Sequence, residues 1–181
     1  IRCDNWRFGL YICRRYAYYY ENRGRPFALC NALSENNIFS DFQSLKINDC
    51  NIVEGVNSLF APVAKDLIEL DIVKTLNIPL LLVVNPKVST ISDVLMCLKS
   101  INTEGVKFAG IIINQYDENS DNLEHKYFPQ ILKEFCDVKI LGILPDYGEV
   151  STIAPETLIE DILTKVNIEE VFGLKIAKLN S

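Results

Sequence analysis

The sequence predicts a doubly wound α/β sandwich built on a mainly parallel sheet, and three observations lead to that fold class. From Asn48 onward, short apolar runs alternate with amphipathic stretches of helical period, which is typical of βαβ units. The runs Leu80–Val84 and Phe108–Ile113 are apolar throughout, as expected for central parallel strands buried on both faces. No repeat or low-complexity linker divides residues 1–181, so we expect a single domain.

Each expected element has a local signal in the sequence. The expected strands are Cys50–Val53, Leu80–Val84, Phe108–Ile113 and Lys139–Leu144. The expected helices are Leu67–Leu76, Ser92–Ile101, Leu123–Phe135 and Leu158–Val171. Ser92 is the predicted N-cap of its helix, because a serine hydroxyl accepts a hydrogen bond from a free backbone N–H. At the front, Leu10–Asn22 is expected to form a tyrosine-rich helix, followed by a short strand over Pro26–Cys30.

The composition excludes several classes of protein. With 49% hydrophobic residues, eight Gly and seven Pro, the chain is neither disordered nor collagen-like. No apolar run reaches the ~20 residues of a membrane span, so no membrane partner is expected. The net charge of −6 disfavours binding to nucleic acid through phosphate contacts. The six cysteines form no C-x-x-C pair, which indicates reduced thiols and a cytoplasmic location.

Polar residues follow the predicted strands, where ligands bind in sheets of this kind. The four dipeptides at these ends are Glu54-Gly55, Asn85-Pro86, Asn114-Gln115 and Pro145-Asp146. A carboxylate directly after a buried strand suits Mg²⁺, and an asparagine amide can read the edge of a base. The alternative to a ligand site is that Glu54 is a solvated acid at a strand end and that Asn114 is a turn residue bonded to its own backbone.

Four stretches within residues 48–150 carry a resemblance to a known family. They are NIVEGVNSLFAPV, LIELDIVKTLNIPLLLVV, VKFAGIIINQY and ILGILP, in that order. The ATP-dependent dethiobiotin synthetases have a strand ending in E-G-A-G-G-L-x-x-P, a helix into l-P-v-i-L-V, a strand l-x-G-v-i-x-N, and l-G-x-i-P. The chain is similar to that family in order and spacing, which implies a three-layer sandwich like that of the P-loop NTPases.

The resemblance also implies two sets of site residues. The nucleotide-binding set is Glu54, Gly55, Val56, Asn57, Asn114, Gln115, Pro145, Asp146 and Tyr147. Glu54 would hold Mg²⁺, Asn114 and Gln115 would read adenine, and the residues from Pro145 would line the base. The substrate-binding set is Ser89, Thr90 and Ile91. These begin a helix whose free N–H groups would reach across a homodimer to the carboxylate of the substrate.

The front of the chain departs from the family pattern. An alignment without gaps places Gly9 at the phosphate-binding Lys and Leu10 at the Mg²⁺-binding Thr of the family's phosphate loop. Asn31 occupies the position of the catalytic Lys, so no catalytic residue is assigned. Val56–Ser58 replaces the sequence A-G-G, and its side chains intrude where bare backbone would meet phosphate. We therefore expect ATP binding to be weakened or lost.

The function implied by the resemblance is the closure of a ureido ring on 7,8-diaminopelargonate, using CO₂, ATP and Mg²⁺. Because phosphoryl transfer depends on positioning and charge neutralisation, the replaced Lys and Thr leave two alternatives open. One is a catalytically inactive relative that keeps the fold and acts as a binding or regulatory module. The other is a misread front third, in which case the true protein is an ordinary enzyme of this family.

Overall fold

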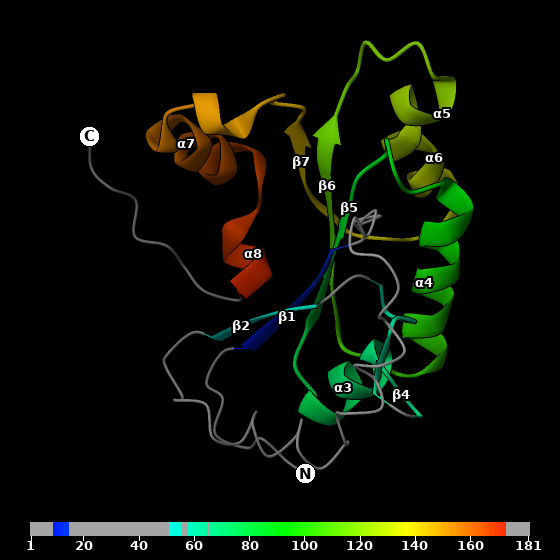
Figure 1. Ribbon diagram of the computed structural model, residues 1–181. Helices are drawn as coiled ribbons and strands as arrows, with labels where there is room; N and C mark the ends of the chain where they lie inside the picture. The colour runs from blue at the N-terminus through cyan, green and yellow to red at the C-terminus, as the bar shows by residue number, and fades with distance from the viewer. Residues whose placement is uncertain (1–8, 15–50, 56–57, 65, 173–181) are drawn as a thin grey trace, which may run out of the picture.

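The computed structural model describes residues 9–14, 51–55, 58–64 and 66–172 of the chain. A five-stranded sheet lies between two layers of helices in this part of the protein (Figure 1). In spatial order its strands are β2 (Asn51–Glu54), β1 (Gly9–Arg14), β5 (Leu80–Val84), β6 (Phe108–Tyr116) and β7 (Ile140–Pro145). All neighbouring strands run parallel. The predicted doubly wound α/β class is confirmed.

Helices cover both faces of the sheet (Figure 1). One layer holds α3 (Glu69–Leu76), α4 (Ile91–Thr103) and α6 (Phe128–Phe135), and the short α5 (Leu123–Lys126) precedes α6. The other holds α7 (Pro155–Lys165) and α8 (Ile168–Phe172), which follow a 3₁₀ turn at Val150–Thr152. A small antiparallel pair, β3 (Pro62–Ala64) and β4 (Leu67–Ile68), leads into α3.

Two apolar cores hold these layers together. The larger core lies between the sheet and α3, α4 and α6, and its buried members include Leu80, Leu82, Ile111, Ile113, Val73, Val94, Phe128 and Leu132. The smaller core consists of Leu81, Leu141, Val166 and Val171, on the side of α8. Successive side chains of a strand point to opposite faces, so Leu80 and Leu81 enter different cores. Burial on both faces explains the uninterrupted apolar sequence of β5.

The helix predicted over Leu10–Asn22 is wrong where the structure describes it. Residues 9–14 form β1, which pairs with β2 on one side and with β5 on the other. The segment Leu10–Cys13 (LYIC) is rich in residues that favour strands, and pairing on both edges decides its conformation. The remainder of that expected helix, the strand expected over 26–30 and Asn31 lie outside the described residues.

The other predicted elements are confirmed with shifted ends. β5 has the predicted bounds, whereas β6 continues three residues past the predicted end at Ile113. The helix expected over Leu123–Phe135 is divided at Tyr127 into α5 and α6. Pro129 accounts for the break, because proline donates no N–H and its ring clashes with the preceding turn. The closing helix is divided at Val166, which forms an antiparallel bridge with Gly142.

The start of α4 also differs from the prediction. Its N-cap is Thr90 and not Ser92, because the Thr90 hydroxyl accepts a hydrogen bond of 3.2 Å from the Asp93 N–H. The Asp93 carboxylate accepts the Thr90 N–H in return, at 3.2 Å. This reciprocal pair is a capping box. In the described part of the chain, no helix is both long and apolar enough to cross a bilayer.

Candidate functional site

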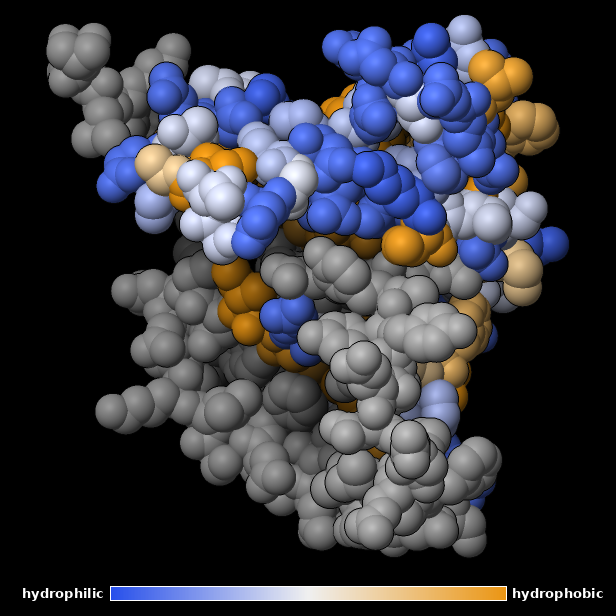
Figure 2. All heavy atoms as spheres, turned by 45° about the horizontal axis from the view of Figure 1, so that its top comes forward, coloured by the Kyte–Doolittle hydropathy of each residue, from blue (hydrophilic) through white to orange (hydrophobic). Residues whose placement is uncertain are grey.

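The carboxyl ends of β5, β6 and β7 meet at one edge of the sheet, at the top of Figure 1. Asn114 and Gln115 lie just before the last residue of β6, and Pro145 ends β7. The register places Tyr116 opposite Pro145. Figure 2 shows that hydrophilic residues cover most of the described surface on this side of the molecule. The structure thus brings two of the predicted dipeptides to one edge.

A β-bulge sits at the predicted base-reading pair. Ile113 pairs with Ile143 and Tyr116 with Pro145, so three steps along β6 match two along β7. The extra residue falls at Asn114-Gln115, and Gln115 has a positive φ of 54°, which non-glycine residues rarely adopt. Bulges turn side chains away from the regular alternation and occur next to functional sites. The bulge therefore redirects the side chain of Gln115 at the end of its strand.

Gln115 is bonded to the end of the neighbouring strand. The Asn85 amide donates from Nδ2 to the Oε1 atom of Gln115. Asn85 is held in turn by the backbone N–H of Lys87, which donates to its Oδ1 atom at 2.9 Å. The ends of β5 and β6 are thereby joined through two side-chain amides. Sequence analysis placed Asn85 at a strand end but assigned it no role.

An ion pair joins the loop after β5 to the loop after β7. The Lys87 ammonium donates to Oδ2 of Asp146, and the Gly148 N–H donates to Oδ1 at 3.1 Å. The hydrogen bond from Lys87, followed by that from Gly148, lowers the pKa of Asp146 from its ordinary value. The same hydrogen bond raises the pKa of Lys87. Asp146 is therefore ionised and held at the end of β7.

Tyr147, the next predicted residue, points toward α7. Its hydroxyl donates to Asp161 at 2.6 Å, and Lys165 donates to the same carboxylate oxygen at 2.7 Å. Burial, with a further contribution from the hydrogen bond to Asp161, raises the pKa of Tyr147 to about 12. The pKa of Asp161 is lowered by Lys165 first and by Tyr147 second. Tyr147 thus ties the loop after β7 to α7.

A hollow of about 540 Å³ opens between the ends of β6 and β7. It is lined by Tyr116, Asp117, Glu118, Asn119, Ile143, Pro145, Asp146 and Lys165. Two of the predicted residues, Pro145 and Asp146, are among them. Three carboxylates line the hollow and its one lysine is paired with Asp161. Like charges repel, so this hollow suits a neutral heterocycle better than a phosphate group.

The hollow also contains residues that sequence analysis missed. Tyr116 donates its hydroxyl to the backbone oxygen of Lys126 at 2.6 Å, and burial raises its pKa. The sequence offered a signal for Tyr116, because it follows the predicted Asn114-Gln115 directly. No sequence signal pointed to Lys165, which reaches the hollow from α7.

Glu54 ends β2 at the same carboxyl edge but far along it. Glu54 pairs with Ile12. Ile12 pairs with Leu81, and Leu81 pairs with Gly110. Glu54 is thus level with Gly110 and three strands away from it, and Gly110 lies four positions before Asn114. Strand spacing and rise then put Glu54 about 20 Å from Asn114. The hollow at β6 and β7 does not include it.

The neighbours of Glu54 are only partly described. Glu54 is exposed and Gly55 is buried, whereas Val56 and Asn57 lie outside the described residues. The described residues contain no group of three His, Cys, Asp or Glu side chains that could hold a metal ion. Gly9 and Leu10 lie inside β1, paired with Asn51 and Ile52. The alignment that placed them in a phosphate loop is therefore wrong at these two positions, because such loops follow a strand and open a helix.

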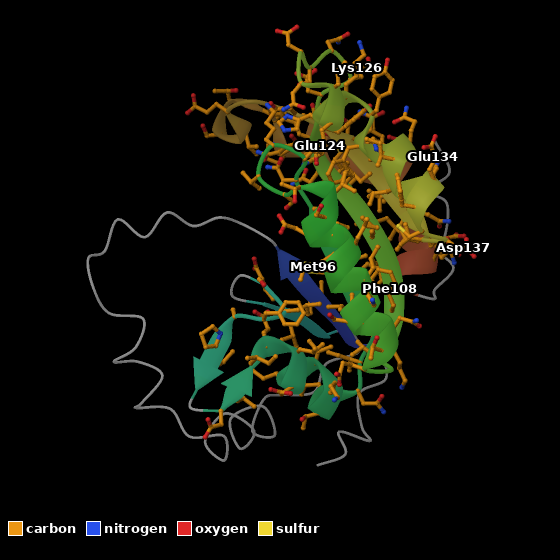
Figure 3. All side chains as sticks on the ribbon, turned by 90° about the vertical axis from the view of Figure 1, so that its right-hand side faces the viewer. Met96, Phe108, Glu124, Lys126, Glu134 and Asp137 are labelled. Atoms are coloured by element: carbon orange, nitrogen blue, oxygen red, sulfur yellow. The ribbon has the colours of Figure 1, made fainter. Side chains whose placement is uncertain are left out.

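The predicted substrate-binding residues begin α4, as expected. Ser89 is 3% exposed, and its Oγ finds no hydrogen-bond partner among the described residues. Thr90 is the N-cap, and the Ile91 N–H donates to Oε1 of Glu124 at 2.9 Å. Figure 3 labels Glu124 near the start of α4. A carboxylate of the chain itself thus occupies a helix N-terminus, where negative charge is favoured.

Comparison with known proteins agrees with this architecture. The model of a family described as an AAA domain (AAA_26) matches residues 16–154. Among curated proteins, the chain is 28% identical over 121 residues to the ATP-dependent dethiobiotin synthetase BioD of Bacillus subtilis (strain 168), covering 67% of this chain and 51% of that protein.

Two further relatives carry the same name. The chain is 31% identical over 145 residues to BioD of Thermodesulfovibrio yellowstonii, covering 76% of this chain and 59% of that protein. It is 30% identical over 115 residues to BioD of Nitrosopumilus maritimus, covering 63% of this chain and 50% of that protein. The chain thus spans about half the length of the curated relatives it matches.

Proposed function

Since the chain belongs to the AAA domain family AAA_26 and is similar to dethiobiotin synthetases, we propose that it takes part in dethiobiotin synthesis. The proposed reaction consumes ATP and CO₂ and closes a ureido ring on 7,8-diaminopelargonate. The single observation that carries the proposal is the hollow between β6 and β7, with the bulged pair Asn114-Gln115 on the adjoining strand end.

The proposed role of this edge is to hold the base of the nucleotide. Tyr116, Ile143 and Pro145 offer apolar surface for a planar ring, and Asp146 offers an ionised acceptor for an exocyclic amine. Small-molecule sites combine apolar surface with polar groups that fix the orientation of the ligand, and this hollow offers both. Because three carboxylates line the hollow, we place the phosphates outside it, along the edge toward β2.

Glu54 is the proposed ligand for Mg²⁺. Mg²⁺ usually takes one or two protein carboxylates together with phosphate oxygens and water. An exposed carboxylate at a strand end therefore fits the ion when a nucleotide supplies the other oxygens. Bound there, the ion would neutralise phosphate charge, and Gly55 would let the backbone approach the phosphates closely. The start of α4, at Ser89–Ile91, is the proposed site for the carboxylate of the substrate, which would have to displace the Glu124 carboxylate from the Ile91 N–H.

An assay of phosphate release from ATP tests the proposal. Diaminopelargonate and bicarbonate are expected to stimulate release in the presence of Mg²⁺, and Glu54→Gln is expected to abolish the stimulated part. Glu104→Gln is the matched control, because Glu104 is an exposed carboxylate paired with Lys74 away from this edge. Stimulated release that survives Glu54→Gln would remove Glu54 as the metal ligand. Absence of stimulated release in the unmodified chain would contradict the proposed reaction.

One observation favours a second candidate, a module that binds nucleotide without turnover. Lys87, which follows β5, and Lys165, on α7 beside the hollow, are both paired with carboxylates, Asp146 and Asp161 respectively. Phosphoryl transfer needs positive charge on the transferred group, and paired lysines offer little. Titration with Mg·ATP separates the candidates: saturable binding without stimulated phosphate release supports the module, and turnover contradicts it.

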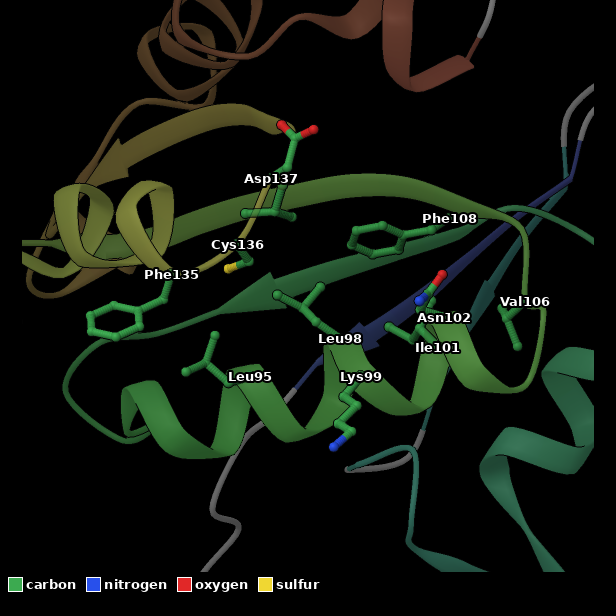
Figure 4. Close-up of a pocket in the computed structure, with 11 residues that line it drawn as sticks. Leu95, Leu98, Lys99, Ile101, Asn102, Val106, Phe108, Phe135, Cys136 and Asp137 are labelled. Atoms are coloured by element: carbon green, nitrogen blue, oxygen red, sulfur yellow. The ribbon is translucent and has the colours of Figure 1, made fainter.

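We propose further that the chain acts as a homodimer in the cytoplasm. The outer face of α4 and α6 carries exposed apolar side chains, with Met96 66% exposed and Phe135 70% exposed, and Figure 3 labels Met96 there. A groove of about 480 Å³ beside Phe135 continues the apolar surface between Leu95, Leu98 and Phe108 (Figure 4).

The charges around this face favour a second copy as its occupant. Lys99 and Asp137 both line the groove, so a two-fold pairing can place each lysine against the partner's carboxylate. Sedimentation analysis tests this arrangement. Met96→Glu and Phe135→Glu are expected to give monomers, and Ile159→Glu, at a 57% exposed position of α7, is the control. A chain that is monomeric without substitution would refute the dimer.

A further inference from the structure

The hydrogen bonds at the end of β5 have a fixed direction. A backbone N–H can only donate, and the N–H of Lys87 points at the side chain of Asn85, with 2.9 Å between nitrogen and Oδ1. An asparagine amide has one acceptor end and one donor end, which are told apart by their partners. The donor from Lys87 therefore identifies the oxygen end of Asn85 and leaves its Nδ2 facing the other way.

The orientation of the Asn85 amide determines that of Gln115 on the next strand. Nδ2 of Asn85 donates to the side chain of Gln115, so the atom of Gln115 that faces Asn85 is Oε1, its acceptor. The Gln115 amide then presents its Nε2 group, with two N–H donors, on its remaining side. Within the part of the chain that the structure describes, the bond from Asn85 is the one side-chain hydrogen bond that Gln115 makes.

The backbone holds Gln115 in this place. Gln115 lies in the bulge of β6 with a positive φ of 54°, a conformation that persists only where the surroundings stabilise it. Pairing of β6 with β5 up to Ile113 and with β7 at Tyr116 fixes the chain on both sides of the bulge. The amide is thus oriented before any ligand arrives, which lowers the cost of ordering it on binding.

From this geometry we propose that Asn85 is a positioning residue that holds the Gln115 amide with its nitrogen outward, so that the ligand atom meeting Gln115 is a hydrogen-bond acceptor. The ligand class is a heterocycle with a ring nitrogen or carbonyl oxygen at that point, and an amino group there is excluded by donor–donor repulsion. The ligand part of this inference rests on the proposed nucleotide site, whereas the orientation of the amide does not.

Side-chain amide exchange measured by NMR tests the orientation without a ligand. In the unmodified chain, the Asn85 NH₂ protons are expected to exchange more slowly than those of Gln115. In Asn85→Asp, both carboxylate oxygens accept, so Gln115 is expected to turn its nitrogen inward and its NH₂ exchange to slow about tenfold. Asn102→Asp adds the same charge at an exposed position of α4 and serves as the control. Equal protection of the Gln115 NH₂ before and after Asn85→Asp would overturn the positioning role.

Binding of ATP and its 1-deaza, 3-deaza and 7-deaza analogues tests the acceptor. One of the three replacements is expected to weaken binding about tenfold in the unmodified chain, and that penalty is expected to disappear in Gln115→Leu and in Asn85→Asp. A penalty that persists in Gln115→Leu, or no penalty for any analogue, would overturn the assignment of the acceptor. If ATP itself does not bind, the nucleotide site and the acceptor assignment both fall, and the exchange measurement alone decides the positioning role.

Discussion

Lys87 and Asp146 form an ion pair that joins the loop after β5 to the loop after β7, across the end of β6 between them. The side chain of Lys87 is 43% exposed and that of Asp146 is 25% exposed. Exposed pairs of this kind contribute little to global stability. Their consequence is local, because the pair fixes the position of the Asp146 carboxylate beside the hollow.

Asp146→Asn is expected to leave the urea midpoint of unfolding almost unchanged at neutral pH. It is expected to weaken the binding of any ligand that uses this carboxylate. The small stabilising effect has a defined pH window. The pKa of Asp146 is lowered, so the effect is present above the ordinary aspartate pKa of about 3.9 and is lost as the pH falls through the lowered value. Urea unfolding of both forms between pH 2 and 7 checks this, and a difference that grows on acidification would contradict it.

Tyr147→Phe removes the hydroxyl that bonds Asp161. Loss of a hydrogen bond of this kind is expected to lower the free energy of unfolding by about 1 kcal/mol. Because the pKa of Tyr147 is raised to about 12, this contribution is complete below the ordinary tyrosine pKa of about 10 and is lost as the pH rises through 12. Alkaline titration of tyrosinate absorbance checks it. Tyr127→Phe removes the hydroxyl of a 47% exposed residue and is the control. It is expected to leave the titration of Tyr147 near pH 12 unchanged.

Thr90→Ala is expected to destabilise the protein by about 1 kcal/mol through loss of the N-cap of α4. Ser92→Ala, at the position that the sequence predicted for the cap, is expected to change stability by less than about 0.5 kcal/mol, as at most surface sites. Thermal unfolding of the two variants compares them directly. A larger loss for Ser92→Ala than for Thr90→Ala would contradict the observed capping box.

Gly142→Ala is expected to loosen the junction between β7 and the chain after α7. A Cβ there would lie 2.7 Å from Cγ2 of Val166 and 2.9 Å from the backbone oxygen of Lys165, so we expect a loss of about 1–3 kcal/mol. The readout is hydrogen exchange at Asn167, whose N–H donates to the Leu141 oxygen at 2.7 Å. Gly148→Ala is the control: nothing lies within 4 Å of its added Cβ, and although the positive φ of 62° strains alanine at that position, the change should leave the Asn167 amide protected.

The fold could be predicted from the sequence where a segment's own pattern decides its structure. The apolar run of β5 has one low-energy placement, buried between two layers, and its predicted bounds match those observed. β1 could not be predicted in this way, because its conformation comes from β2 and β5 on its two edges. The break before α6 carried a local signal, Pro129, that outweighs the helical period of the surrounding residues.

The candidate site could be predicted only in part. The rule that ligands bind beyond the carboxyl ends of parallel strands placed Gln115 and Asp146 at one edge. The bulge that turns Gln115 depends on a register difference between β6 and β7, and no single strand encodes that difference. The pairing of Asp146 with Lys87 joins residues 59 positions apart, and neither residue signals the other.

The strand order has a consequence for how the chain folds. β5, β6 and β7 are neighbours both along the chain and in the sheet, so each needs only one helical connection to meet the next. β1 must instead close a loop of more than sixty residues to reach β5, and loop closure slows the formation of distant contacts. We therefore expect assembly to start in the carboxyl-terminal strands and to end when β1, the blue strand of Figure 1, enters the sheet.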